Sequence, residues 1–206
     1  AKALPDYPPF GKRALRDNDW FTTLKRDNVN LHNSGIDHID PDAIVDKSGA
    51  RYPVDAIVFA TGFHASRMIY PMEVVGKGGQ SLRDVWGDDE PRAYLGICVP
   101  GFPNLFLTYG PNTNLAHGGS IIFQTECQVH YIIRCLARMA SADDATLEVT
   151  QSAHDAYNVT MDNALNEMVW THLGVTNWYQ NKTGRITTNS PWRLVEYWEM
   201  TRDVDP

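Results

Sequence analysis

The chain has 206 residues, 43% of them hydrophobic and 21% charged, which is enough apolar material for a globular protein with a sizeable core. Its formal charge is -7 at pH 7, and acids and bases are mixed along the chain, which argues against nucleic acid or an anionic membrane surface as a partner. No apolar run approaches the roughly 20 residues that span a bilayer, so we expect a soluble protein.

The first stretch, residues 5–13, is rich in proline and aromatic residues and predicts an extended connector. Short runs typical of hairpin strands follow at Asn28–His32, Ile36–Ile39 and Ala43–Asp46. The run Val54–Ala60 is almost entirely apolar, which predicts a strand covered on both faces, as in a parallel sheet.

A short helix is expected near Leu82–Trp86, followed by a second buried strand at Leu105–Tyr109. Apolar residues then recur at helical spacing from Ser120 to about Ala140, which predicts a long amphipathic helix. A strand at Thr146–Val149 precedes a helix that we expect to begin near Ser152.

The C-terminal part has many large apolar residues and predicts one further helix, with Ser190 as N-cap and Pro191 in its first turn. We find no internal repeat, so a single α/β unit is the simplest organisation. Within it, residues 1–112 are expected to form a connector and sheet segment, and residues 113–206 a mainly helical segment.

The cysteines Cys98, Cys127 and Cys135 form no CxxC pair, which argues against a disulfide framework and against a zinc site. Each lies among apolar residues, so we expect buried, unreactive thiols. This cysteine usage fits a cytoplasmic protein.

Two expected strands end in glycine turns, Thr61-Gly62 and Gly110-Pro111-Asn112, where a ligand would meet bare backbone. Beyond the second turn, Gly118-Gly119-Ser120 leads into the long helix, whose amino end favours negative charge on a phosphate or a reduced flavin. The alternative is a tight turn with an ordinary helix cap, and the pattern alone does not decide between them.

Four segments in order carry a family resemblance: PFGKR (9–13), DAIVFATGF (55–63), GFPNLFLTYGP (101–111) and NWY (177–179). Together they resemble the flavin-containing monooxygenases of the Baeyer–Villiger type. The segment from Trp178 to Trp192 is most similar to the 4-hydroxyacetophenone monooxygenase subgroup. The fold implied is α/β: part of a Rossmann-like domain that binds FAD and NAD(P), with added C-terminal helices.

The resemblance implies that Arg13 is the active-site arginine, which holds the nicotinamide cofactor and stabilises an anionic C4a-peroxyflavin. A guanidinium suits that role because it keeps its charge at any working pH. For two adjacent basic residues, the alternative is that Lys12 and Arg13 form a solvated pair in a connector.

The same resemblance gives the remaining candidates cofactor-binding roles. Thr61 and Gly62 would lie where the flavin and nicotinamide domains meet, and Trp178 would contact NADP, with Lys182 or Arg185 reaching its phosphates. The residues placed near the flavin, besides Lys12, are Gly110, Pro111, Asn112, Gly118, Gly119 and Ser120.

No GxGxxG fingerprint follows a strand, although complete members of this family would carry one for FAD and one for NADPH. We therefore expect the chain to be the C-terminal part of such an enzyme, inactive and without tightly bound cofactor when isolated.

For the complete protein, the resemblance implies that NADPH reduces FAD, that O2 adds to the flavin, and that oxygen is inserted beside a ketone carbonyl to give an ester. An aryl ketone is the expected small-molecule substrate, and the sequence leaves open whether the protein forms a homodimer. Three alternatives remain: a flavin-dependent S- or N-oxygenase, a pyridine-nucleotide reductase, and a non-catalytic interaction module.

Overall fold

The chain forms two compact units in the computed structural model, which describes residues 3–116, 118–142 and 146–204. Unit 1 consists of residues 3–6 and 15–63, and unit 2 of residues 7–14 and 64–204. The division between compact parts falls after residue 63. The expected change at residue 112, from a connector and sheet segment to a mainly helical segment, stays a prediction.

Unit 1 contains a small antiparallel sheet in the order β1-β2-β3 and one short helix, α1 (Trp20–Thr23). Its strands are β1 (Ile36–Asp40), β2 (Ala43–Asp46) and β3 (Arg51–Pro53). The first two confirm the expected hairpin, while β3 was missed. The expected strand at Asn28–His32 is wrong, because no strand lies there.

The loop between β2 and β3 is organised by the carboxylate of Asp46. Its Oδ1 accepts hydrogen bonds from the amide nitrogens of Ser48 and Ala50 at 2.8 and 3.1 Å, and from the Ser48 hydroxyl at 2.5 Å. Its Oδ2 accepts one from the Tyr52 hydroxyl at 3.0 Å. These hydrogen bonds lower the pKa of Asp46 from 3.8 to about 2, and the bond from the Ser48 hydroxyl has the largest effect.

We expect this loop to weaken in acid. Because the folded-state pKa of Asp46 lies below the unfolded value, its stabilising effect is fully present above pH 3.8 and is lost as the pH falls through about 2. A carboxyl-detected NMR titration should give a midpoint near pH 2, and Asp46→Asn should remove this transition. A midpoint at the ordinary value of 3.8 would contradict the assignment.

The expected strand at Val54–Ala60 is also wrong: the segment runs without strand pairing in unit 1. Val58 and Phe59 are 89% and 71% exposed, although their side chains are those of a buried strand. A strand is stabilised by hydrogen bonds to its neighbours, and no neighbouring strand lies beside this segment in the described residues. The apolar pattern is therefore present without the sheet that it predicts.

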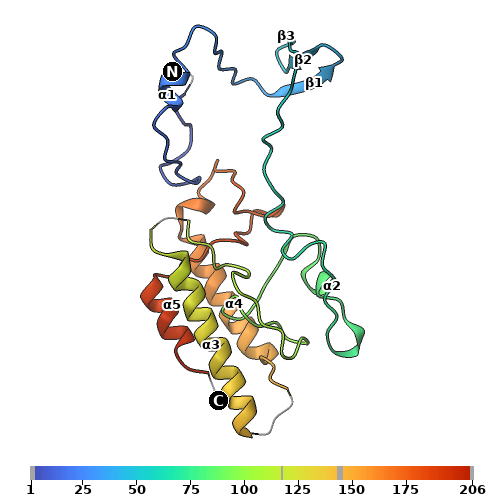
Figure 1. Ribbon diagram of the computed structural model, residues 1–206, viewed down its shortest axis with the longest axis vertical. Coiled ribbons are helices and arrows are strands. Elements are labelled where there is room, and N and C mark those ends of the chain that lie inside the picture. Colours follow the sequence, from blue (N-terminus) through green and yellow to red (C-terminus); the bar gives the residue numbers. More distant parts are fainter. Residues whose placement is uncertain (1–2, 117, 143–145, 205–206) are drawn as a thin grey trace. The chain divides into compact units, whose positions relative to one another are not determined.

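Unit 2 contains three longer helices, α3 (Ile121–Ala142), α4 (Gln151–Asn166) and α5 (Leu194–Thr201), of which α3 and α5 pack against each other (Figure 1). It also contains α2 (Leu82–Trp86) and 3₁₀ turns at Lys77–Gly79 and Val169–Thr171. Helices α2, α3 and α4 lie where the hydrophobic spacing predicts them. That spacing is a reliable signal because the apolar stripe of each helix faces the core.

Two helix starts differ from the sequence-based prediction. The N-cap of α4 is Thr150, whose hydroxyl accepts from the amide of Ala153 at 3.2 Å, and not Ser152. Helix α5 begins at Leu194, after Arg193, instead of following Ser190 directly. Its first turn is fixed by Glu196, which accepts from the amide of Arg193 at 2.8 Å.

Neither of the strands predicted in unit 2 forms. Neither Leu105–Tyr109 nor Thr146–Val149 is part of a strand, and the first segment bends at residues 108 and 109. Each is held by isolated bonds: Leu107 donates its amide to Ile97 O at 2.8 Å, and Asn104 donates its amide to Leu147 O at 3.0 Å. The partners of both segments are therefore loops and not neighbouring strands.

The core of unit 2 confirms the prediction that the three cysteines are buried. Cys98, Cys127 and Cys135 are all buried and free. Cys98 and Cys135 pack with Tyr131 of α3, and burial raises the pKa of Cys98 to about 12, which disfavours a reactive thiolate.

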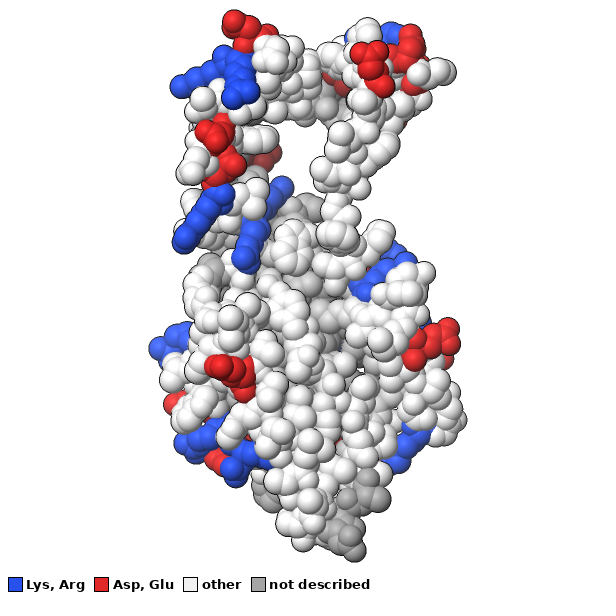
Figure 2. All heavy atoms as spheres, viewed as in Figure 1, with Lys and Arg blue, Asp and Glu red and all other residues white. Residues whose placement is uncertain are grey.

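Acidic and basic side chains are interspersed on the face drawn in Figure 2, as the sequence predicts. None of the helices in the described residues has the length and apolar character needed to cross a membrane.

Candidate functional site

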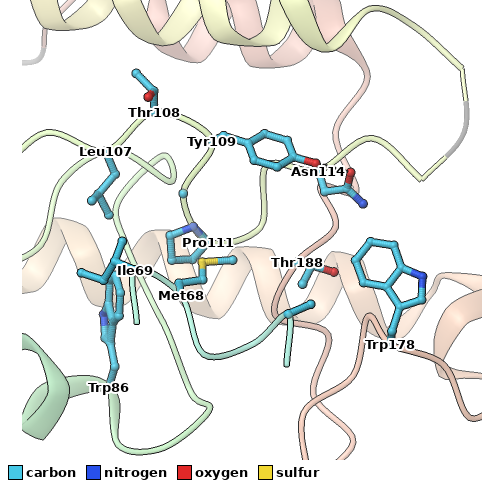
Figure 3. Close-up of a pocket in the computed structure, with 12 residues that line it drawn as sticks. Met68, Ile69, Trp86, Leu107, Thr108, Tyr109, Pro111, Asn114, Trp178 and Thr188 are labelled. Carbon is cyan, nitrogen blue, oxygen red and sulfur yellow. Dashed lines mark hydrogen bonds between the residues drawn. The ribbon is translucent and has the colours of Figure 1, made fainter. Parts of the chain in front are cut away.

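A pocket of about 230 Å³ lies in unit 2, and we call it the Trp178 pocket. Figure 3 shows Trp86 and Trp178 on opposite sides of it, with Met68 and Pro111 between them. Most of the lining is apolar, and none of the described residues that line it has a charged side chain. Such a surface suits a flat, mostly uncharged ring.

The floor of the pocket depends on a close contact between two turns, Gly96 and Gly110, which we call the glycine crossing. A Cβ atom on Gly110 would lie 2.2 Å from the carbonyl oxygen of Gly96. Gly96 has φ +69°, and a Cβ there would lie 2.2 Å from Cγ2 of Thr113. Only glycine lets these backbones approach so closely, and this places Gly110 and Pro111 in the pocket lining.

The wall that carries Trp178 and Thr188 is brought to the glycine turn by pairing between distant segments. The amides of Asn112 and Asn114 donate to Thr187 O and Thr188 O at 3.0 and 2.9 Å, and Ser190 N donates to Asn114 O at 2.9 Å. Residues 112–114 thus run parallel to residues 187–190.

The ring of Trp178 is supported by its neighbour. Its centroid lies 4.6 Å from that of Tyr179 in an edge-on arrangement, and Tyr179 is fully buried. Trp178 itself is 47% exposed, so part of its ring is free to contact a ligand.

Neutral polar groups lie along one side of the pocket. The Tyr109 hydroxyl donates to Oδ1 of Asn114 at 2.7 Å, and Asn114 donates through Nδ2 to Oδ1 of Asn189 at 2.6 Å. The amide nitrogen Nδ2 of Asn189 is buried and has no hydrogen-bond partner among the described residues. Tyr109 and Asn114 line the pocket, so their neutral polar groups can orient a polar ligand without requiring it to be charged, while the buried Asn189 holds Asn114 in place.

The structure brings together three of the residues predicted from the sequence, namely Gly110, Pro111 and Trp178. Asn112, a fourth candidate, is buried, and its Nδ2 donates to Ile186 O and Asn189 O at 2.9 and 3.2 Å. The side chain of Asn112 therefore fixes the paired segments.

The predicted turn Gly118-Gly119-Ser120 lies at a different hollow of about 370 Å³, lined also by Leu115, Trp170 and Arg193. Gly118 and Gly119 line it, while Ser120 lies at the amino end of α3 and accepts from the amide of Phe123 at 3.4 Å.

Arg13 belongs to unit 2 and contacts the backbone beside this hollow. Its Nη1 donates to Leu115 O at 2.7 Å and to Ala116 O at 3.4 Å. Lys12 points elsewhere, with its Nζ 4.5 Å from the ring centroid of Tyr7. Arg13 is exposed, and the two bonds occupy only one of its nitrogen atoms, so the guanidinium can still meet a ligand.

Thr61 and Gly62 belong to unit 1, at the end of the extended segment, and both are exposed. Their predicted role where two domains meet stays a prediction.

The basic residues after Trp178 have acidic partners within the chain. Lys182 forms an ion pair with Asp88 at 2.5 Å, which raises the pKa of Lys182, and its side chain is 74% exposed. Arg185 bonds to Asp162 at 2.8 Å, and burial lowers the pKa of this arginine. A phosphate role for either residue would require an exchange of partners.

Most of the other pocket residues could not be identified from the sequence. Tyr109, Asn114 and Thr188 become neighbours only through the pairing of residues 112–114 with residues 187–190, and Met68 and Trp86 come from separate loops. The one available signal was that Tyr109 directly precedes the Gly110-Pro111 turn.

No family model matches the chain. It is 41% identical over 205 residues to an uncharacterized monooxygenase of Sinorhizobium fredii, a match that covers 100% of this chain and 31% of that protein. It is 35% identical over 205 residues to a Baeyer-Villiger monooxygenase of Pseudomonas aeruginosa, covering 99% of this chain and 38% of the relative. The crystal structure of OTEMO in complex with FAD and NADP matches with a TM-score of 0.80 and 25% identity, over 96% of this chain and 37% of OTEMO.

Proposed function

Because the chain belongs to the flavin-containing monooxygenases of the Baeyer–Villiger type and spans about a third of the relatives it matches, we propose that it supplies part of the FAD and NADPH site of a ketone-oxygenating enzyme. The complete protein would take electrons from NADPH and insert one oxygen atom from O2 beside the carbonyl of a ketone. An aryl ketone is the proposed substrate class.

The observation that carries this proposal is the convergence of Gly110, Pro111 and Trp178 on one pocket. These residues belong to two of the segments that resemble the family. In the sequence, Pro111 and Trp178 are 67 positions apart. Their meeting at a neutral, mostly apolar surface is what a nicotinamide ring and its ribose would need.

The residues present fit these cofactors. The exposed part of Trp178 offers an aromatic face, and the glycine crossing leaves no side chain over Gly110. At the second hollow, the amino end of α3 favours a group with negative character, and Arg13 provides a fixed positive charge beside Leu115. No cluster that could hold a metal ion occurs among the residues that the structure describes.

A bound flavin supplies the oxygen chemistry, since reduced flavin reacts with O2. The chain's own contribution is to bind and orient. Trp178 would hold the nicotinamide side together with the Gly110-Pro111 turn, which the resemblance alone placed near the flavin but which lines the same pocket as Trp178. Arg13 would stabilise negative charge on the reduced ring.

The test uses the complete protein loaded with FAD. We expect NADPH oxidation that depends on an aryl ketone such as 4-hydroxyacetophenone, with formation of the ester and incorporation of one atom from ¹⁸O2. A sulfide converted to sulfoxide, with ketones untouched, would favour an S-oxygenase. NADPH oxidation without ¹⁸O incorporation into any product would favour a reductase. The 206-residue chain alone is expected to retain no flavin absorbance.

Trp178→Ala tests the pocket itself. Loss of its ring should raise KM for NADPH about tenfold, the size expected for one aromatic contact, with a smaller change in kcat. Trp198→Ala is the matched control, because Trp198 is similarly exposed, at 41%, on α5 and does not line the pocket. Equal KM values for the two variants would argue against the pocket as the nicotinamide site.

A further inference from the structure

A buried glutamine in α3 connects both sides of the glycine crossing. Gln128 is fully buried, and its Oε1 accepts a hydrogen bond from the amide of Tyr109 at 2.8 Å. Its Nε2 donates to the Tyr197 hydroxyl at 3.1 Å, and that hydroxyl donates to Leu95 O at 2.6 Å. The chain of bonds therefore begins one residue before Gly110 and ends one residue before Gly96.

The direction of all three hydrogen bonds in this series is fixed by the two backbone groups at its ends, the Tyr109 amide and the Leu95 carbonyl oxygen. A backbone amide can only donate and a carbonyl oxygen can only accept. Gln128 must therefore point its oxygen toward Tyr109, and the Tyr197 hydroxyl must accept from Gln128 while it donates to Leu95. No alternative arrangement of the same groups satisfies all three bonds.

Both turns held in this way have unfavourable backbone conformations. Tyr109 has φ +56° and Leu95 has φ +55°, in the left-handed region that residues with side chains rarely adopt. Such conformations persist only where surrounding contacts hold them. Gln128 and Tyr197 supply those contacts from inside the core, where Tyr197 is 1% exposed and burial raises the pKa of its hydroxyl.

We propose that Gln128 and Tyr197 form an amide clamp, a pair of positioning residues that hold the floor of the Trp178 pocket in the shape that binds the nicotinamide nucleotide. The proposal rests on the proposed function for its ligand. Helices α3 and α5 pack against each other, and no residue of either helix lines the pocket in the described part of the chain. Through the clamp, this packing sets the geometry of the turn at Gly110, which does line the pocket.

The test compares variants in the same helix. Gln128→Leu removes both bonds at constant size, and Tyr197→Phe removes only the hydroxyl. Gln124→Leu is the control, because Gln124 is one turn earlier in α3 and 1% exposed, and its Nε2 and Oε1 have no hydrogen-bond partner in the described part of the chain. All three changes are made in the complete, FAD-loaded protein.

Two measurements decide the matter. Hydrogen exchange at the amide of Tyr109 should become about tenfold faster in Gln128→Leu, the effect expected for one lost buried hydrogen bond, and should stay unchanged in Gln124→Leu. The dissociation constant of NADP⁺ should rise about tenfold in Gln128→Leu and in Tyr197→Phe, with the double variant no weaker than either single one.

The clamp would be refuted by exchange at Tyr109 that is unchanged, or changed equally by Gln124→Leu. It would also be refuted if exchange became faster while NADP⁺ affinity stayed the same. Failure of the proposed function is recognised separately, because the wild-type protein would then bind no NADP⁺, and the exchange measurement alone would decide whether the clamp holds the turn.

Discussion

Replacing Arg13 by alanine in the complete, FAD-loaded protein is expected to lower kcat for ketone oxygenation by about 100- to 1000-fold, the usual cost of removing one donor that stabilises developing negative charge. The guanidinium remains charged at any working pH, and its Nη1 is held by the carbonyl oxygens of Leu115 and Ala116. Leu115 and Ala116 both line the hollow at the amino end of α3, so these bonds place the guanidinium beside it. Steady-state kinetics with an aryl ketone, at saturating NADPH, provide the measurement.

Two comparisons separate catalysis from a structural role for Arg13. Arg13→Lys keeps the charge but loses the planar donor array, so it should recover only part of the rate. Arg16→Ala removes an exposed arginine three positions away and should leave kcat unchanged. Because Arg13 is exposed, its loss should alter the melting temperature little. If Arg13→Ala oxygenated ketones at the wild-type rate, the assignment of this residue would be wrong.

Gly110→Ala is expected to destabilise unit 2 by about 3 kcal/mol, the upper end of the usual cost of overpacking. The added Cβ would lie 2.2 Å from Gly96 O and 3.1 Å from Cβ of Leu107. Gly110 does not have positive φ, so the loss would come from this contact and not from the backbone conformation of alanine. Urea unfolding, followed by circular dichroism of the helices, gives the free energy of unfolding.

Gly35→Ala is the matched control for this prediction. A Cβ at Gly35 would meet only the flexible end of the Lys47 side chain, at 3.3 Å, and this end can move. Its free energy of unfolding should change by less than about 1 kcal/mol. If Gly110→Ala proved as stable as Gly35→Ala, the close approach at the glycine crossing would be wrong.

The sequence was most informative about elements whose signal lies within themselves. The apolar stripes of α3 and α4 recur over several turns, so these helices could be located from spacing alone. The start of α5 could not, because the cap comes from Glu196 inside the helix and not from Ser190 before it.

Strand predictions failed for a different reason. Val54–Ala60 and Leu105–Tyr109 have the composition of buried strands, but a strand exists only with a hydrogen-bonded neighbour, and that information lies elsewhere in a chain. The β1-β2 hairpin was predictable because both strands and their turn are contiguous.

The pocket residues show the same difference between signals that lie within one segment and contacts that depend on distant segments. Gly110, Pro111 and Trp178 were identified through segments that resemble a family. Asn114 and Thr188 could not be, because their places in the pocket arise from pairing between segments more than seventy positions apart.

The glycine crossing also limits how this pocket can diversify. Its floor is main chain packed on main chain, and any other residue at either glycine would add a Cβ atom only 2.2 Å from a neighbouring atom. Changes in ligand preference must therefore arise in the walls, at Met68, Ile69 and Leu107, whose side chains can be exchanged one at a time. A directed-evolution library aimed at new ligands should randomise these three positions and leave both glycines untouched.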